Sequence, residues 1–164
     1  MQKNLILIGM AGCGKSTVGV LLAKALGYTF IDTDLIIQQN EGRLLQEIIN
    51  ADGVEAFKAA EERALLSVNA KRAVIATGGS AVYSSAGMEW LKRSGRCVWL
   101  RLPFEEISRR IHNIATRGIA IAPGKSLRDA FVERQPLYER YADITVDGGG
   151  DIEATVASVM EKLR

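Results

Sequence analysis

A stretch near the amino terminus has the residue types and spacing of a phosphate-binding loop. Residues Gly9–Thr17 follow the pattern G-x-x-x-x-G-K-S. The glycines let backbone N–H groups curl around phosphate oxygens, Lys15 can reach the outer phosphates, and the Ser16 hydroxyl can bind a magnesium ion. A simple glycine-rich turn is the alternative. The context disfavours it, because the apolar run Leu5–Ile8 precedes the loop and a helical pattern follows it.

Two carboxylates follow the second apolar segment. The short aromatic and β-branched run Tyr28–Ile31 leads directly into Asp32 and Asp34. Ligands of open α/β sheets bind outside the carboxyl ends of the strands, so both side chains are expected to face the same crevice as the phosphate loop. Asp32 suits a magnesium ion together with Ser16, although it could instead cap the following helix.

Glycines and arginines complete the set of candidate site residues. The pair Gly78 and Gly79 follows a buried apolar strand. Arg117 lies in a segment, 113–124, that has no sustained period and carries Arg-Gly and Pro-Gly turns, which is typical of a mobile loop at an active site. An arginine there could stabilise charge on a transferred phosphoryl group, or it could be ordinary solvated surface.

The elements that position these residues alternate between strand and helix. Apolar runs predict strands at 5–8, 28–31, 72–76, 97–102 and 144–146. Helical periods lie at 18–26, 35–69, 85–93, 105–111, 126 onward and 152–163. Gly42 and Gly53 divide the second of these into three helices, and Pro136 is expected to break or bend the helix that starts at Ser126. The alternation predicts an α/β fold with a parallel sheet and helices on both faces.

Composition narrows the function further. The chain has 164 residues, a net charge of +2 and two cysteines that are far apart. This predicts one domain and gives no reason to expect a nucleic-acid partner, a zinc site or a redox dithiol. No segment approaches the roughly 18 apolar residues that a membrane span needs. We therefore expect a cytoplasmic protein without a membrane partner.

With these motifs in order, the chain resembles the shikimate kinase family of small P-loop kinases over nearly its whole length. The matching pieces are Gly9–Thr17, Phe30–Asp34, residues 53–61 with Phe57 and Glu61, Ala76–Gly79, Arg110 with Arg117, and Arg134–Tyr138. The resemblance implies transfer of the γ-phosphate of ATP to the 3-hydroxyl of shikimate. It also implies a single P-loop domain, 1–164, that acts as a monomer. Its five-stranded parallel core would carry a helical substrate cap at about 34–62 and a mobile lid at about 112–125.

The resemblance also implies a role for each matching residue. ATP would be bound by Gly12, Cys13, Gly14, Lys15, Ser16, Thr17, Arg110 and Arg117, with Arg110 against the adenine. Mg²⁺ would be held by Ser16 and Asp32. The acceptor would be bound by Asp34, Lys58, Gly78, Gly79 and Arg134, with Arg134 on its carboxylate. The catalytic residues would be Lys15, Asp34 and Arg117. Glu61 is expected to be structural, as a partner for Arg134 or Lys58.

Three positions depart from the family pattern. Lys58 stands where the family has an arginine, Ser80 replaces the third glycine of a triple, and Gly118 replaces a proline after Arg117. All three concern the acceptor or the lid, so alternatives stay open. These are a kinase for another small polyhydroxy acid such as gluconate, an adenylate-type kinase, or a nucleotide-binding regulatory protein without turnover. The combination of Asp34 and Arg134 favours a carboxylated polyol.

Overall fold

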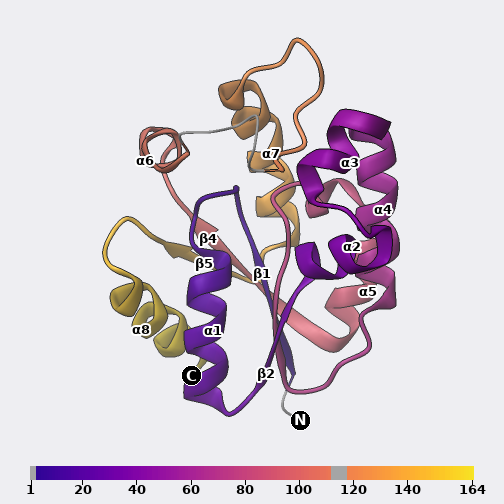
Figure 1. Cartoon of the computed structure of the whole chain (residues 1–164). Helices are drawn as coiled ribbons and strands as arrows, with labels where there is room; N and C mark the ends of the chain where they lie inside the picture. The colour runs from indigo at the N-terminus through magenta and orange to yellow at the C-terminus, as the bar shows by residue number, and fades with distance from the viewer. Residues whose placement is uncertain (1–2, 112–117) are drawn as a thin grey trace.

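Five parallel strands form one sheet, in the order β2-β3-β1-β4-β5. The computed structural model describes residues 3–111 and 118–164, and Figure 1 shows the chain. The strands are β1 (Asn4–Ile8), β2 (Thr29–Asp32), β3 (Ala73–Ala76), β4 (Gly95–Arg101) and β5 (Ile144–Asp147). The α/β fold class and the five-stranded parallel sheet predicted above are thus confirmed.

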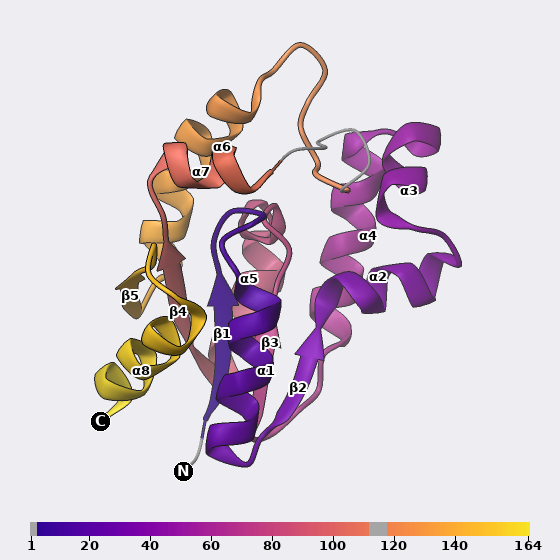
Figure 2. The same cartoon turned by 60° about the vertical axis from the view of Figure 1, so that its left-hand side comes forward.

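Helices cover both faces of this sheet. They are α1 (Lys15–Leu26), α2 (Thr33–Glu41), α3 (Leu45–Asp52), α4 (Val54–Ser67), α5 (Ser85–Ser94), α6 (Phe104–Arg110), α7 (Leu127–Tyr141) and α8 (Ile152–Leu163), with a short 3₁₀ helix η1 (Ala81–Tyr83). Helices α1 and α8 lie together on one face, and α5 lies on the other (Figures 1 and 2). None of the described helices is long and apolar enough to cross a membrane.

The central strand explains the first apolar run of the sequence. Strand β1 pairs with β3 through Leu5–Leu7 and with β4 through Asn4–Ile8. All five of its residues are buried. A parallel strand that is covered on both faces needs apolar residues on both sides, so a continuous run replaces an alternating one. The same strand then delivers the phosphate loop to the carboxyl edge of the sheet.

Helices α2, α3 and α4 stand beside the carboxyl edge and have a small core of their own. Its buried residues are Ile37, Ile48, Phe57, Ala60, Ala64 and Ala120. Gly42 and Gly53 adopt positive φ angles of 66° and 88° where α2 and α3 end, as their places in the sequence suggested. Because Ala120 comes from the loop before α7, this core joins the three helices to that loop.

Of the two effects predicted for Pro136, a break or a bend, the break does not occur in helix α7. The helix runs unbroken from Leu127 to Tyr141. Proline removes one hydrogen bond, to the carbonyl of Val132, and that residue is exposed to solvent. Beyond the proline, Tyr138 is fully buried, its hydroxyl donates to the Gly79 carbonyl at 2.6 Å, and its ring packs 5.7 Å from that of Trp99. This packing holds the second half of the helix in place.

Candidate active site

The segment Gly9–Thr17 connects β1 to the first turn of α1. It includes a positively charged side chain, that of Lys15, which is almost entirely buried. Gly14 precedes the helix with a φ of 94°, a conformation that favours glycine. Lys15, the first residue of α1, is 7% exposed, and its Nζ donates to the carbonyls of Gly9 at 2.6 Å and Met10 at 2.8 Å. The ammonium is therefore held over the loop, beside the amino end of a helix, where an anion is favoured.

Two further residues were predicted to contact the nucleotide: Cys13, which is part of this loop, and Arg110, which lies against it. Cys13 is buried and packs in the main core, with Sγ 3.6 Å from Lys15 Nζ, so only its backbone is available to a phosphate. Arg110 ends α6; its Nη1 donates to the Gly12 carbonyl at 3.4 Å and its Nε to Glu106 at 2.9 Å. Neither side chain lines the cavity described below. The neighbouring Arg109 pairs with Glu106 and is largely exposed.

Ser16 and Asp32 meet across the carboxyl ends of β1 and β2. The Ser16 hydroxyl donates to Asp32 Oδ2 at 2.8 Å, and Asp32 Oδ1 accepts from the backbone N–H of Asp34 at 3.0 Å. Asp32 therefore caps α2 and faces Ser16 at the same time, so the two roles considered for it are compatible. In the described ranges, no group of three or more His, Cys, Asp or Glu residues could hold a metal ion. A cation beside Ser16 and Asp32 would need other ligands, such as phosphate oxygens and water.

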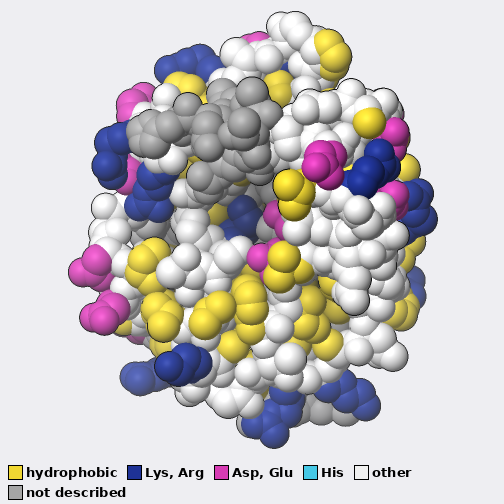
Figure 3. Space-filling view, in the orientation of Figure 1, with side chains coloured by type: hydrophobic (Ala, Val, Ile, Leu, Met, Phe, Trp, Pro, Cys, Tyr) yellow, Lys and Arg dark blue, Asp and Glu magenta, His cyan; other side chains and the backbone are white. Residues whose placement is uncertain are grey.

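A cavity of about 240 Å³ lies between the phosphate loop, helices α2 and α4, and helix α7. The space-filling view shows acidic and basic side chains close together in a hollow on this face (Figure 3). The lining residues are Ala11, Gly12, Gly14, Lys15, Ser16, Thr17, Asp34, Phe57, Glu61, Thr77, Gly78, Gly79, Ser80, Gly118, Ile119, Ala120 and Arg134. The cavity thus brings together residues from both halves of the predicted site.

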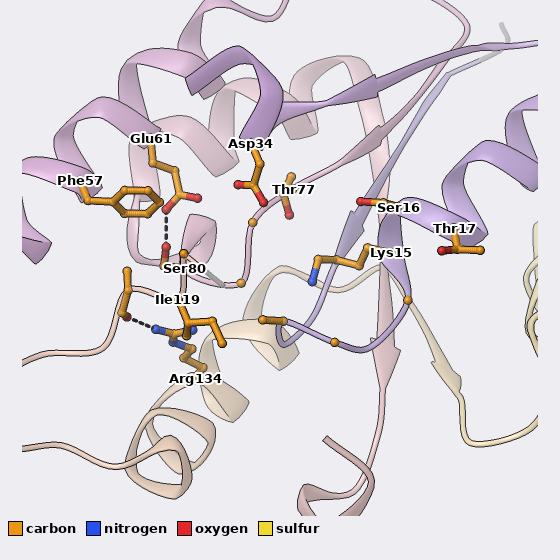
Figure 4. Close-up of a pocket in the computed structure, with 17 residues that line it drawn as sticks. Lys15, Ser16, Thr17, Asp34, Phe57, Glu61, Thr77, Ser80, Ile119 and Arg134 are labelled. Carbon is orange, nitrogen blue, oxygen red and sulfur yellow. Dashed lines mark hydrogen bonds between the residues drawn. The ribbon is translucent and has the colours of Figure 1, made fainter. Parts of the chain in front are cut away.

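Asp34 and Glu61 point into the cavity from α2 and α4 (Figure 4). A Cβ atom at Gly78 would lie 2.6 Å from Glu61 Oε2 and 2.7 Å from Asp34 Oδ1, so only glycine leaves room for both carboxylates. Burial, followed by the charge of Asp32, raises the pKa of Asp34 to about 6, against the opposing effect of Lys15. Burial raises the pKa of Glu61 to about 7. Both groups can therefore exchange a proton near neutral pH.

Glu61 has a different partner from either of those predicted. The Ser80 hydroxyl donates to Glu61 Oε1 at 2.5 Å, and both residues are buried. Glu61 Oε2 has no hydrogen-bond partner among the described residues. The serine that replaces a glycine therefore does more than fill space, because it fixes one oxygen of a buried carboxyl group and partly opposes the rise in the pKa of Glu61 that burial causes.

Arg134 faces these two carboxyl groups from the opposite wall (Figure 4). It is 1% exposed, and its Nη2 donates to the Ala120 carbonyl while its Nε donates to the Tyr83 hydroxyl at 3.3 Å. The third nitrogen, Nη1, would lie 3.3 Å from a Cβ atom at Gly79. Gly79 therefore keeps this side of the guanidinium open to the cavity. A fixed guanidinium with one open edge suits a carboxylate ligand.

Lys58 does not line the cavity, in contrast to its predicted place beside the acceptor. Its ammonium lies 3.7 Å from Glu55 Oε1 and 4.1 Å from the centroid of the Tyr83 ring. The lysine stem is flexible and its charge is strongly hydrated, so it stays at the outer surface of α4, where it finds an anion and an aromatic face. The contact of Lys58 with the acceptor therefore stays a prediction, which acceptor kinetics can test.

We expect Lys58→Met to raise the KM for the acceptor by less than about fivefold, because a partly exposed cation–π contact is worth about 1 kcal/mol or less. Arg134→Lys, which removes a buried fork that faces the cavity, should raise the same KM by about tenfold or more. Steady-state kinetics with the acceptor varied at saturating ATP measures both. An equal loss in the two variants would place Lys58 in the cavity after all.

Several lining residues were not predicted as site residues. Thr77 lines the cavity, while its hydroxyl donates to the Leu7 carbonyl at 2.8 Å, and Phe57 forms an apolar wall below Glu61. Ile119 and Ala120 come from the loop before α7. None of these side chains is charged, and the loop has no period in sequence. Thr77 and Phe57 belong to segments that match the family pattern, Ala76–Gly79 and residues 53–61, but neither was given a role there.

The predicted lid, 112–125, is described only in part. Arg117 lies outside the described residues, so its predicted roles in ATP binding and catalysis have no structural test here. Gly118 follows with a φ of 76°, and its N–H donates to Gln46 Oε1 of α3 at 3.0 Å. Ile119 and Ala120 are both buried. The described residues Gly118 and Ala120, which lie within the predicted lid, are thus held against helices α2, α3 and α4.

Comparison with known proteins agrees with this geometry. The family model "Shikimate kinase" matches residues 11–164. The chain is 38% identical over 168 residues to the shikimate kinase of Moorella thermoacetica, covering 100% of this chain and 96% of that one. The chain belongs to the shikimate kinase family. It is also 33% identical to shikimate kinase 2 of Pectobacterium carotovorum over 173 residues, covering 100% of this chain and 98% of the relative.

A solved member of the shikimate kinase family has the same fold. It is the shikimate kinase from Acinetobacter baumannii in complex with shikimate, which superposes with a TM-score of 0.89 at 30% identity. The superposition covers 99% of this chain and 93% of that chain. The resemblance predicted from the ordered motifs is therefore confirmed, and the departures at Lys58, Ser80 and Gly118 are variations within the family.

Proposed function

We propose that the protein is a shikimate kinase, which transfers the γ-phosphate of ATP to the 3-hydroxyl of shikimate. One observation carries this proposal: a phosphate loop with Lys15 and a carboxylate-binding Arg134 line the same small cavity. Two acidic side chains, Asp34 and Glu61, lie between them. The cavity can thus receive a phosphate at one end and a carboxylate at the other, with hydroxyl groups in between.

On the donor side, the amide groups of Gly12–Thr17 bind the phosphates of ATP, and Lys15 neutralises charge on the transferred group. Arg110 lies against the loop and contacts the adenine, while Arg117 stabilises the transferred phosphoryl group. Ser16 and Asp32 offer the hard oxygen ligands that Mg²⁺ prefers, and no larger cluster of ligands is needed when phosphates supply the rest. When bound, Mg²⁺ neutralises charge on the phosphates.

On the acceptor side, Arg134 pairs with the carboxylate of shikimate, and the backbone at Gly78 and Gly79 allows the ring to approach closely. Asp34 orients the attacking hydroxyl and accepts its proton. Phosphoryl transfer has a loose transition state, so correct positioning and a nearby carboxylate are sufficient for this step. The raised pKa of Asp34, about 6, suits this role, because the carboxylate is a stronger base than an ordinary one and is still mostly ionised at neutral pH.

The test is ADP release from ATP and Mg²⁺ with shikimate, quinate, gluconate and AMP as acceptors in turn. We expect shikimate to give the highest kcat/KM and AMP to give no more ADP than the acceptor-free control. Turnover with gluconate or quinate but not with shikimate would overturn the substrate assignment and leave the reaction class intact. Nucleotide binding without turnover of any acceptor would favour a regulatory relative.

The proposal also covers the oligomeric state of the protein and the compartment in which it acts. We propose that the enzyme acts as a monomer, because the groups assigned above to both substrates, from Lys15 to Arg134, are supplied by a single fold. We propose that it works in the cytoplasm, where ATP is available. Sedimentation of the purified protein across a range of concentrations tests the first point. A stable dimer whose dissociation abolishes ADP release would contradict it.

A further inference from the structure

The side chain of Tyr83 connects the carboxylate-binding arginine to the cap, and the sequence motifs gave it no role. Tyr83 ends the 3₁₀ helix η1, which follows Gly78, Gly79 and Ser80 at the carboxyl end of β3. Its hydroxyl accepts from Arg134 Nε at 3.3 Å and donates to Glu133 Oε1 at 2.6 Å. The Tyr83 hydroxyl therefore acts as a hydrogen-bond acceptor and as a hydrogen-bond donor at the same time.

This hydroxyl completes the fixation of Arg134. The Ala120 carbonyl holds Nη2 and Tyr83 holds Nε, so two of the three guanidinium nitrogens have protein partners. Nη1 lies at Gly79, on the cavity side, and has no hydrogen bond to any described residue. A planar guanidinium whose other nitrogens are bound has little freedom to rotate. The protein thus aims one N–H group at the cavity.

Two positively charged side chains lie over the aromatic ring of Tyr83. Lys58 Nζ lies 4.1 Å from the ring centroid, and Arg134 Cζ lies 5.3 Å from it. Lys58 comes from α4 of the cap and Arg134 from α7, so the ring joins two walls of the cavity. Burial, and next the hydrogen bond to Glu133, raises the pKa of the Tyr83 hydroxyl, which therefore keeps its proton. The other oxygen of Glu133, Oε2, accepts from Lys125 Nζ at 2.7 Å, so both oxygens of this carboxylate have partners.

We propose that Tyr83 is a positioning residue for the acceptor carboxylate: it orients Arg134 toward the cavity, and Lys58 steadies the tyrosine ring from outside. This inference rests on the proposed function. Lys58 lies over the Tyr83 ring, and the Tyr83 hydroxyl accepts from Arg134, so the tyrosine connects the lysine to the arginine that faces the cavity. Selectivity for a carboxylated acceptor would thus depend on a residue that does not touch it.

The test uses Tyr83→Phe, which removes the hydroxyl and keeps the ring under Lys58. Calorimetry measures the affinity for shikimate and for its uncharged methyl ester, and the ratio of the two affinities reports the contact with the carboxylate. We expect Tyr83→Phe to lower this ratio about fivefold, the size of effect typical for the loss of one ordinary hydrogen bond, because the tyrosine acts on the carboxylate only through Arg134. The KM for ATP should stay within about twofold of the wild-type value.

Two comparisons separate positioning from general packing. In an Arg134→Lys background, Tyr83→Phe should leave the ratio unchanged, because coupled residues are not additive. Tyr28→Phe is the matched control, since Tyr28 also packs under a cation, Arg72, but makes no hydrogen bond with Arg134. An unchanged ratio in Tyr83→Phe, or an equal loss of affinity for both ligands, would overturn the proposal.

Binding and turnover are measured separately, so the two proposals can fail independently. Wild-type protein that binds shikimate but releases no ADP would overturn the proposed function alone, and the affinity ratio would still test Tyr83. If another carboxylate of the panel is the true acceptor, the ratio is measured with that acid and its methyl ester. A lower ratio of the affinities for the acid and its methyl ester in Tyr83→Phe then supports the positioning role for that substrate.

Discussion

Replacing Lys15 with alanine is expected to lower kcat for ADP release by about 10³-fold, the loss typical when one preorganised charge or donor is removed from a transition state. The ammonium is almost completely buried and lies over the loop carbonyls of Gly9 and Met10. It is therefore fixed before the nucleotide arrives, and it gains its full value only when charge develops on the transferred phosphoryl group. A coupled ADP assay at saturating shikimate measures the effect.

The buried contacts of Lys15 require a control for folding, because alanine leaves two carbonyls without their partner. Lys15→Met keeps most of the side-chain volume, and thermal unfolding of both variants shows whether the fold is kept. Lys24→Ala is the matched control, since Lys24 lies exposed in the last turn of the same helix. Less than a tenfold loss in well-folded Lys15→Ala and Lys15→Met would remove Lys15 from the catalytic set.

Much of the fold could be predicted because the signals are local. The apolar run of β1 and the glycine spacing of Gly9–Thr17 fix a strand, a loop and a helix without reference to the rest of the chain. Asp32 and Asp34 could be placed beside that loop because the carboxyl ends of parallel strands share one edge. The structure has these elements within a few residues of their predicted bounds.

The orientation of long side chains could not be predicted in the same way. The flexible stem of Lys58 turns to Glu55 and Tyr83, and this orientation is set by tertiary neighbours. The Ser80–Glu61 hydrogen bond joins residues that are 19 positions apart, and no local pattern indicates it. Pro136 shows the same limit, since the packing of Tyr138 outweighs a local signal that usually ends a helix.

Asp34→Asn should lower kcat/KM for shikimate by about 10²- to 10⁴-fold, the range for loss of a general base, while the dissociation constant of ATP changes little. Asparagine has nearly the same shape but cannot accept the proton of the attacking hydroxyl. The side chain enters the cavity from the first turn of α2, whereas Lys15 and the loop amides serve the nucleotide. Acceptor kinetics and ATP calorimetry on the same protein separate the two effects.

The pH dependence gives an independent check on Asp34. Its pKa is raised to about 6, so the carboxyl group is ionised and able to accept a proton above that pH and becomes protonated below it. For the wild type, kcat/KM should therefore fall about tenfold for each pH unit below 6. In Asp34→Asn this decrease of kcat/KM at acid pH should be absent. Glu55→Gln, on the exposed face of α4, is the control and should keep it. If Asp34→Asn retained both the wild-type rate and its acid limb, the attacking hydroxyl would have to give its proton to a different group, and Glu61 is the other carboxyl group in the cavity.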